Sequence, residues 1–374
     1  MPQPPCSSSR LLNRLLRSLQ LRSSVLVMAV IGLGLLPACS STHPDNSEKD
    51  TAHFQTGESA VLAGEHPANL VFQPSHSPHV TVRSTYLEKT PGTIVYQEGQ
   101  DYLLDYQAAT IQRTAGSRIP DFSTNLLYGK VDFDHSKFPG YGNKPFIVYI
   151  DYAHKQKVDW STQTPQKGLL AETVKKLKNG DKLKIVAFGD SITAGGEASQ
   201  TNLIYWQRWA DALQNKYPRA KIEAINGATG GDTTRNGLER LQTKVINEQP
   251  DLVLIGFGMN DQNIQPFGVP LDQFKENLRK MINRIRSTTK ADVILLSAFP
   301  PNPQWHFGSH QMDKYAQATQ EVAREENCAY ANVYHRWVSI ATNKKPEDLL
   351  GNNINHPNDF GHWIYFRVLK QLEL

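Results

Sequence analysis

From about residue 168 to the C-terminus, short apolar runs alternate with longer stretches whose apolar residues recur at helical spacing. Short apolar runs are typical of strands buried on both faces, and their alternation with helices predicts a parallel sheet covered on both sides. The expected strands span 184–188, 222–225, 252–255, 293–296 and 329–334, and the expected helices span 203–217, 234–247, 271–285, 315–326 and 360–372. We therefore expect an α/β domain over residues 166–374, with its active site at the carboxyl ends of the strands.

Residues 70–165 have a different pattern, with short alternating runs separated by turn signals such as Pro91-Gly92. This pattern predicts a small all-β, sandwich-like domain. The expected strands are 79–82, 93–96, 102–106 and 146–150. The region carries no obvious chemistry, and two roles stay open for it: contact with substrate, or bracing of the α/β domain.

The first 38 residues have the composition of a secretory signal, with four arginines, no acidic residue and a nearly continuous apolar run over 25–36. That run is too short to span a bilayer comfortably. It ends in Leu36-Pro37-Ala38-Cys39, which resembles a bacterial lipobox, and the alternative is a plain signal peptide with an incidental cysteine. We expect a protein lipidated at Cys39 and held in the bacterial cell envelope, facing the periplasm or the surface, with residues 39–69 as a flexible tether.

The net charge of +4 comes from the leader, because four of the 40 Lys and Arg and none of the 36 Asp and Glu lie in residues 1–38. The remainder is electrically balanced, which argues against a nucleic-acid partner. Loss of the leader would leave Cys39 and Cys328, one acylated and the other unpaired, so no disulfide is expected within the chain.

Polar, glycine-rich loops follow the first three predicted strands, at 189–193, 226–233 and 256–261, and a fourth polar segment lies at 353–357. Acyl transfer at neutral pH needs a nucleophile, a base that takes its proton, and donors for the developing oxyanion. These segments can supply all three: Ser191 as nucleophile, His356 as base, and backbone or amide donors at Ser191, Gly231 and Asn260. A G-x-S-x-G elbow and an H-E-x-x-H motif are both absent.

The SGNH (GDSL) hydrolases carry four sequence motifs in a fixed order. This chain contains similar motifs in the same order: Gly-Asp-Ser-Ile-Thr, Asn-Gly-x-x-x-Gly-Asp-Thr, Gly-x-Asn-Asp and His-Pro. Residues 182–374 thus resemble that family. The resemblance implies a flavodoxin-like three-layer α/β/α fold and an esterase that needs no cofactor or metal. It also implies that Ser191 is the nucleophile, that Gly231 and Asn260 complete the oxyanion hole with Ser191, and that His356 is the general base.

One position departs from the family pattern, which places Asp three residues before the histidine, where this chain has Asn353. A neutral amide can orient an imidazole but cannot stabilise imidazolium by charge. The candidates for orienting His356 are Asp348, a backbone carbonyl and Asn353 itself. Our preferred interpretation is a Ser–His dyad. Asp190 and Asp232 are interpreted as acceptors that brace their loops.

Trp305 follows the proline-rich stretch 300–303, and it is expected either to offer a sugar-stacking face or to pack at the domain interface. The function expected is removal of acetyl or other short acyl groups from an acylated carbohydrate outside the cytoplasm. The alternatives are an SGNH O-acetyltransferase, a lipid or small-ester esterase, and a non-catalytic carbohydrate-binding lipoprotein.

Overall fold

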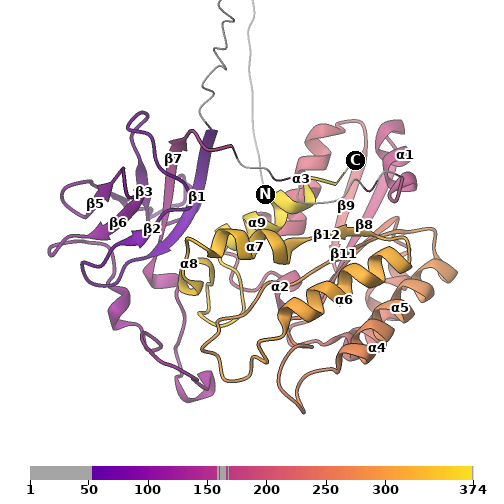
Figure 1. The fold of residues 1–374 in the computed structure, drawn as a ribbon. Coiled ribbons are helices and arrows are strands. Elements are labelled where there is room, and N and C mark those ends of the chain that lie inside the picture. Colours follow the sequence, from indigo (N-terminus) through magenta and orange to yellow (C-terminus); the bar gives the residue numbers. More distant parts are fainter. Residues whose placement is uncertain (1–52, 158–159, 161–165, 167, 373) are drawn as a thin grey trace, which may run out of the picture. The chain divides into compact units, whose positions relative to one another are not determined.

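A computed structural model describes residues 53–157, 160, 166, 168–372 and 374 (Figure 1). Residues Asp50–Leu374 form one compact unit. Within the described residues, two antiparallel sheets lie in the N-terminal part and a parallel sheet lies in the C-terminal part. The boundary near residue 165 between two separate domains stays a prediction.

The C-terminal sheet has five parallel strands in the order β12-β11-β10-β8-β9. Its strands are β8 (Lys182–Gly189), β9 (Lys221–Asn226), β10 (Leu252–Gly256), β11 (Asp292–Leu296) and β12 (Ala329–Ala331). The strand residues Val186, Leu254 and Ile294 are fully buried or nearly so, as expected for strands covered on both faces.

Helices cover this sheet on both faces (Figure 1). The helices are α1 (Ala171–Asn179), α2 (Ser191–Ala194), α3 (Tyr205–Lys216), α4 (Thr234–Lys244), α5 (Leu271–Thr288), α6 (Met312–Glu325), α7 (Val333–Ala341), α8 (Pro346–Leu349) and α9 (Asp359–Leu369). Helix α5 packs between α4 and α6, while α9 packs against α3 and α7. The predicted three-layer α/β/α architecture is confirmed. The last predicted strand, 329–334, is shorter than expected, because helix α7 begins at Val333.

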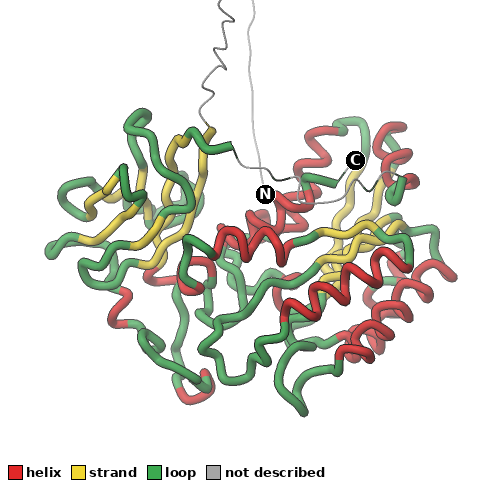
Figure 2. Tube along the Cα trace, viewed as in Figure 1, coloured by secondary structure: helices red, strands yellow, loops and turns green. Residues whose placement is uncertain are grey.

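The N-terminal sheets have the orders β1-β7-β3-β4 and β2-β6-β5. Their strands are β1 (His53–Val61), β2 (Ala68–Asn69), β3 (Thr81–Arg83), β4 (Val95–Tyr96), β5 (Tyr102–Asp105), β6 (Thr110–Arg113) and β7 (Ile147–His154). All of their pairings are antiparallel, which confirms the predicted small β-rich region. Residues 114–146, which we call the connecting segment, join β6 to β7 mostly as loop, with short 3-10 helices at 122–124, 135–137 and 144–146 (Figure 2).

The prediction of a flexible tether over residues 39–69 is wrong for residues 53–69. Strand β1 occupies much of this stretch and pairs with β7 along almost its whole length, with a bulge between Gln55 and Glu58. Its sequence carries little apolar periodicity because three of the side chains it buries, Gln55, Glu58 and Ser59, are polar. The predicted signal, Cys39 and residues 39–52 lie outside the described residues. Among the residues that the structure describes, none of the helices has the length and apolar character needed to cross a membrane.

A buried charge network joins β1 to the segment around α8. The Lys344 ammonium lies 3.0 Å from Glu58 Oε1 and 4.0 Å from Asp348 Oδ2, and the Lys344 and Glu58 side chains are both fully buried. Lys344 also donates to the carbonyl of Asn69 at 2.8 Å, while Asp348 Oδ1 accepts from the backbone N–H of Val61 at 2.9 Å. The β-rich region and the α/β region therefore share buried polar groups that neither could satisfy alone.

Substitution of Lys344 by Met should lower the free energy of unfolding by about 3–5 kcal/mol, because it leaves the Glu58 carboxylate buried without its cation. Urea denaturation followed by tryptophan fluorescence measures the loss. Lys182→Met is the matched control, since it removes an ion pair with Glu223 that is largely exposed, and it should hardly change the transition. Equal effects of the two substitutions would contradict the structural role of the network.

Candidate functional site

Ser191 is the first residue of α2 and lies two positions after the end of β8, a strand flanked by β9 and β10 on its two sides. Asp190 caps this short helix, and its Oδ1 accepts from the Ile192 backbone N–H at 2.9 Å. The cap fixes the turn between strand and helix and leaves the Ser191 side chain partly exposed. The nucleophile predicted from the sequence therefore lies at the carboxyl edge of the sheet.

His356 lies within hydrogen-bonding distance of Ser191, with Nε2 2.8 Å from Ser191 Oγ. The His356 loop, which we define as residues 350–358, is shaped by Asn352. The Asn352 Oδ1 atom accepts from the backbone N–H groups of Ile354, Asn355 and His356 at 2.9 to 3.0 Å. Two residues that are 165 positions apart in the sequence are thus brought into the geometry of a nucleophile and its base.

Two of the three predicted oxyanion donors, Gly231 and Asn260, lie on the loops after β9 and β10, and the third is the backbone N–H of Ser191. A Cβ atom placed on Gly230, the neighbour of Gly231, would lie 3.9 Å from Ser191 Cβ, so this loop approaches the nucleophile. Asn260 is tied to the same loop because its Nδ2 donates to the Asp232 carbonyl at 2.9 Å. That bond uses one of the two amide hydrogens of Asn260, which leaves the other available for an oxyanion.

The two residues predicted to orient His356 make other contacts. Asn353 is buried in a left-handed conformation, and its Oδ1 lies 3.4 Å from the amide nitrogens of Asn143 and Asn302. Asp348 binds the backbone of β1 with one carboxylate oxygen, and its other oxygen accepts from the Lys345 N–H at 3.0 Å. Both side chains therefore fix the surrounding backbone, and their part in orienting His356, like the preferred Ser–His dyad, stays a prediction.

The carboxylate that does approach the imidazole is Glu197, which sequence reasoning missed. Its Oε1 lies 4.0 Å from His356 Nδ1, and its Oε2 lies 3.0 Å from the ammonium of Lys144 in the connecting segment. The pKa of Glu197 is lowered, chiefly by its interaction with the His356 ring and further by Lys144, against the effect of partial burial. The signal in the sequence was an acidic residue six positions after the nucleophile, just beyond Gly195-Gly196.

Gly196 allows the His356 ring to approach the nucleophile loop. A Cβ atom at this position would lie 3.0 Å from His356 Nδ1 and 2.9 Å from the Ser191 carbonyl oxygen. The Gly196 carbonyl oxygen is 3.1 Å from Nε2 of His362, a buried residue whose pKa burial lowers to about 3. His362 is therefore neutral at physiological pH and can brace the loop as a donor.

Trp305 packs at the interface, the second of its two expected placements, and does not offer a stacking face. Its side chain is only 6% exposed, and its Nε1 donates to His135 Nδ1 at 3.0 Å. It belongs to a buried apolar cluster with Leu127, Phe133 and Ile354, which joins the connecting segment to the His356 loop. The sequence could not separate the two placements, because the hydrogen-bond partner of Trp305, His135, is 170 residues away.

A cavity of about 300 Å³ opens beside the Glu197 side chain. Its walls include Tyr141, Lys144 and Phe146 of the connecting segment, together with Gly351 of the His356 loop.

The described residues contain no cluster of three or more His, Cys, Asp or Glu side chains that could hold a metal ion.

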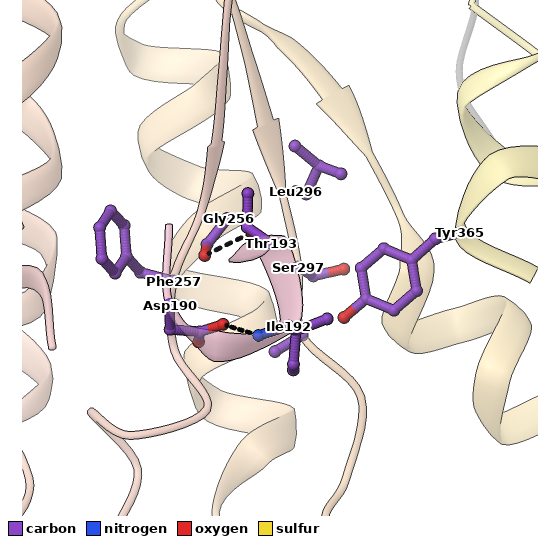
Figure 3. A pocket seen from close by; sticks show the side chains of 9 residues that line it. Asp190, Ile192, Thr193, Gly256, Phe257, Leu296, Ser297 and Tyr365 are labelled. Carbon is purple, nitrogen blue, oxygen red and sulfur yellow. Dashed lines mark hydrogen bonds between the residues drawn. The ribbon is translucent and has the colours of Figure 1, made fainter. Parts of the chain in front are cut away.

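Asp190 and Asp232 make the bracing contacts expected from the sequence. Asp232 forms an ion pair with Arg240, and Asp190 borders a small cavity of about 10 Å³ below the nucleophile turn. Figure 3 shows the Asp190 carboxylate directed at the Ile192 backbone nitrogen. Burial raises the pKa of Asp190 to about 7, reinforced by the neighbouring Asp261 and Asp232, and burial also raises the pKa of Asp261 to about 6.

Known proteins similar to this chain are esterases and lipases. The model of the GDSL-like lipase/acylhydrolase family matches residues 187–364. An acetylxylan esterase from Geobacillus stearothermophilus is 26% identical over 208 residues, which cover 52% of this chain and 94% of that protein. An arylesterase from Vibrio mimicus is 28% identical over 195 residues, covering 50% of this chain and 88% of its own length.

Two further similarities concern a lipoprotein and a solved structure. An uncharacterised lipoprotein, YqeF of Bacillus subtilis, is 34% identical over 105 residues, which cover 27% of this chain and 43% of YqeF. The crystal structure of the acetylxylan esterase Axe2 from G. stearothermophilus aligns with a TM-score of 0.45 and 26% identity, covering 51% of this chain and 94% of that one.

The raised pKa of Asp190 predicts a specific dependence of stability on pH. A carboxyl whose pKa rises from 3.8 to about 7 on folding contributes stability below pH 4 that is lost as the pH approaches 7. Asp190→Asn keeps the capping oxygen and removes the titration, so its free energy of unfolding should fall less between pH 4 and pH 8 than that of the wild type. Urea titrations at several pH values test this, with the exposed Asp211→Asn as control. Parallel pH profiles for wild type and Asp190→Asn would contradict the assignment.

Proposed function

Because the chain belongs to the GDSL-like lipase/acylhydrolase (SGNH) family, we propose that its physiological substrate is an acetylated or otherwise short-acylated polysaccharide outside the cytoplasm. The family membership makes the protein a carboxylic ester hydrolase. We further propose which residues carry out the reaction, that the substrate is a carbohydrate ester, and that the enzyme acts in the cell envelope.

The 2.8 Å contact between His356 Nε2 and Ser191 Oγ is the observation that carries the mechanism. Ser191 Oγ attacks the ester carbonyl carbon while His356 Nε2 takes its proton, and the carbonyl oxygen becomes an oxyanion. Collapse of this intermediate expels the alcohol, which receives the proton from His356. Water activated by the same imidazole then releases the acid and restores Ser191.

The oxyanion formed in each half of the reaction needs donors that are in place beforehand. The backbone N–H groups of Ser191 and Gly231 and the free amide hydrogen of Asn260 would provide them. The hydrogen bond from Asn260 to the Asp232 carbonyl supports this role, because it fixes the orientation of the amide before substrate arrives.

The carbohydrate part of the proposal is supported by the acetylxylan esterase relative, which aligns over 94% of its own length. The relatives include both an acetylxylan esterase and an arylesterase, so the alcohol part of the substrate differs among them. A panel of acetylated xylan, mannan and peptidoglycan fragments, scored for released acetate by the purified protein, tests the assignment.

The proposed location rests on the lipobox-like Leu36-Pro37-Ala38-Cys39 and on the similarity to a lipoprotein over 105 residues. We propose that Cys39 carries the lipid and that the enzyme acts at the surface of a membrane in the cell envelope. Acylated cell-envelope or environmental glycans are the substrates within reach of such an enzyme.

Ser191→Ala should abolish hydrolysis of p-nitrophenyl acetate, because no other group at the site can form the acyl-enzyme. Release of p-nitrophenol measures the reaction. Ser199→Ala is a suitable control, since this exposed serine lies on the same loop and should be dispensable. Turnover that survives in Ser191→Ala would remove the mechanism.

Asn260→Ala should lower kcat by roughly 10²–10³ with a smaller effect on KM, the usual result of removing one oxyanion donor. Steady-state kinetics on p-nitrophenyl acetate give both constants. The exposed Asn247→Ala controls for loss of an amide in general. A kcat equal to that of the wild type would exclude Asn260 from the oxyanion hole.

A further inference from the structure

The two nitrogens of the His356 ring face different partners. Nε2 lies 2.8 Å from the Ser191 hydroxyl, while Nδ1 lies 4.0 Å from Glu197 Oε1. In a Ser–His–acid triad, a carboxylate on the Nδ1 side holds the ring in the correct tautomer and stabilises the imidazolium formed during attack. Since Asn353 and Asp348 bind elsewhere, Glu197 is the carboxylate placed to meet this need.

Local geometry holds Glu197 on the Nδ1 side of the ring. Its backbone has a φ of 65°, in the left-handed region, so the chain turns sharply where the side chain leaves. Gly351 of the His356 loop makes room for that side chain, because a Cβ atom there would lie 2.5 Å from Glu197 Cβ. The two loops are therefore fitted to each other at this carboxylate.

Lys144 fixes the carboxylate from a third element. Its ammonium lies 3.0 Å from Glu197 Oε2, the oxygen that does not face His356. The ion pair with Lys144 can thus keep Glu197 ionised, with its other oxygen, Oε1, directed at the imidazole. The further titratable groups around it are Tyr141, whose pKa is raised by burial and by Glu197, and the neutral His362.

We propose that Glu197 is the positioning residue for His356, and that Lys144 of the connecting segment holds it in place. The proposal rests on the proposed function, because it concerns the same Ser191–His356 pair. During turnover the proton taken from Ser191 makes the ring cationic, and the 4.0 Å separation closes to a charge-assisted hydrogen bond. The N-terminal part of the chain therefore contributes a residue to the machinery of the α/β region.

Glu197→Gln is the first test, because it keeps the size of the side chain and removes its charge. We expect kcat on p-nitrophenyl acetate to fall roughly ten-fold or more with KM nearly unchanged. Glu197→Asp should restore part of kcat.

The matched control for this substitution is Glu223→Gln. Glu223 is also ion-paired to a lysine, but the pair is exposed and Lys182 stands at the amino end of β8, away from the site. It should behave as the wild type does. A kcat loss shared by both variants, or a loss in Glu197→Gln of which Glu197→Asp restores no part, would show that Glu197 has only a structural role and would overturn the proposal.

Lys144→Met tests the connecting segment. We expect a smaller loss in kcat, about two- to five-fold, because the carboxylate stays but is less well held. The same substitution in the Glu197→Gln background should cause no further loss, since Lys144 acts through Glu197. Additive losses in the double variant would contradict that coupling.

A measurement that does not depend on turnover separates this proposal from the proposed function. The imidazole nitrogens of His356 can be observed by ¹⁵N NMR, with the signals assigned by their absence in His356→Gln. Glu197→Gln should change the ¹⁵N chemical shift of Nδ1, because this nitrogen loses the carboxylate that it faces. An unchanged Nδ1 shift would overturn the role of Glu197 even in an active enzyme, whereas a changed shift in a protein without Ser191-dependent hydrolysis would instead overturn the proposed function.

Discussion

The position of His356 depends on hydrogen bonds that its loop receives from distant parts of the chain. The Asn143 backbone N–H donates to the Gly351 carbonyl at 2.7 Å, and the Asn143 side chain donates to the Leu350 carbonyl at 2.9 Å. At the other end of the loop, Asn358 Nδ2 donates to Ser59 Oγ of β1 at 3.0 Å. The loop buries Asn353 and Asn358 as well as the apolar Leu350 and Ile354, so these bonds satisfy polar groups that burial would otherwise leave unpaired. The 2.8 Å contact with Ser191 follows from them.

This dependence changes the interpretation of the β-rich region. The sequence left open whether it touches substrate or braces the α/β region, and the buried Glu58–Lys344–Asp348 network and the Asn143 contacts favour bracing. The connecting segment does more than brace, because it brings Lys144 to Glu197 and packs Phe133 against Trp305. A polar interface of this kind is satisfied only when both sides are present, and the separated parts would expose unpaired charges.

The parts of the structure that the sequence could predict are those governed by local pattern. The strand at 184–188 is an apolar run followed by Gly-Asp-Ser, so both the strand and the place of the nucleophile can be read directly. Strand β1 could not be predicted, because it buries Glu58 and Ser59 against partners nearly 300 residues away. Glu197 was missed for a related reason. The role of Glu197 depends on the direction in which a left-handed turn points its side chain. The spacing of apolar residues in the sequence does not specify that direction.

The ionisation states around the site divide into two groups that suit acyl transfer. Glu197, on the Nδ1 side of the imidazole, has a lowered pKa and is negative, where the proposed mechanism forms a cation. Asp190 and Asp261 are buried and have raised pKa values, so each carries less negative charge than an exposed carboxylate near neutral pH. A full negative charge close to Ser191 would oppose the proposed oxyanion through a medium of low dielectric constant. Burial of these two acids is therefore compatible with the proposed oxyanion, while the half-buried Glu197 keeps the charge that the proposed imidazolium needs. Carboxylates thus serve opposite electrostatic purposes, because burial dominates at Asp190 and Asp261, whereas the neighbouring His356 and Lys144 dominate at Glu197.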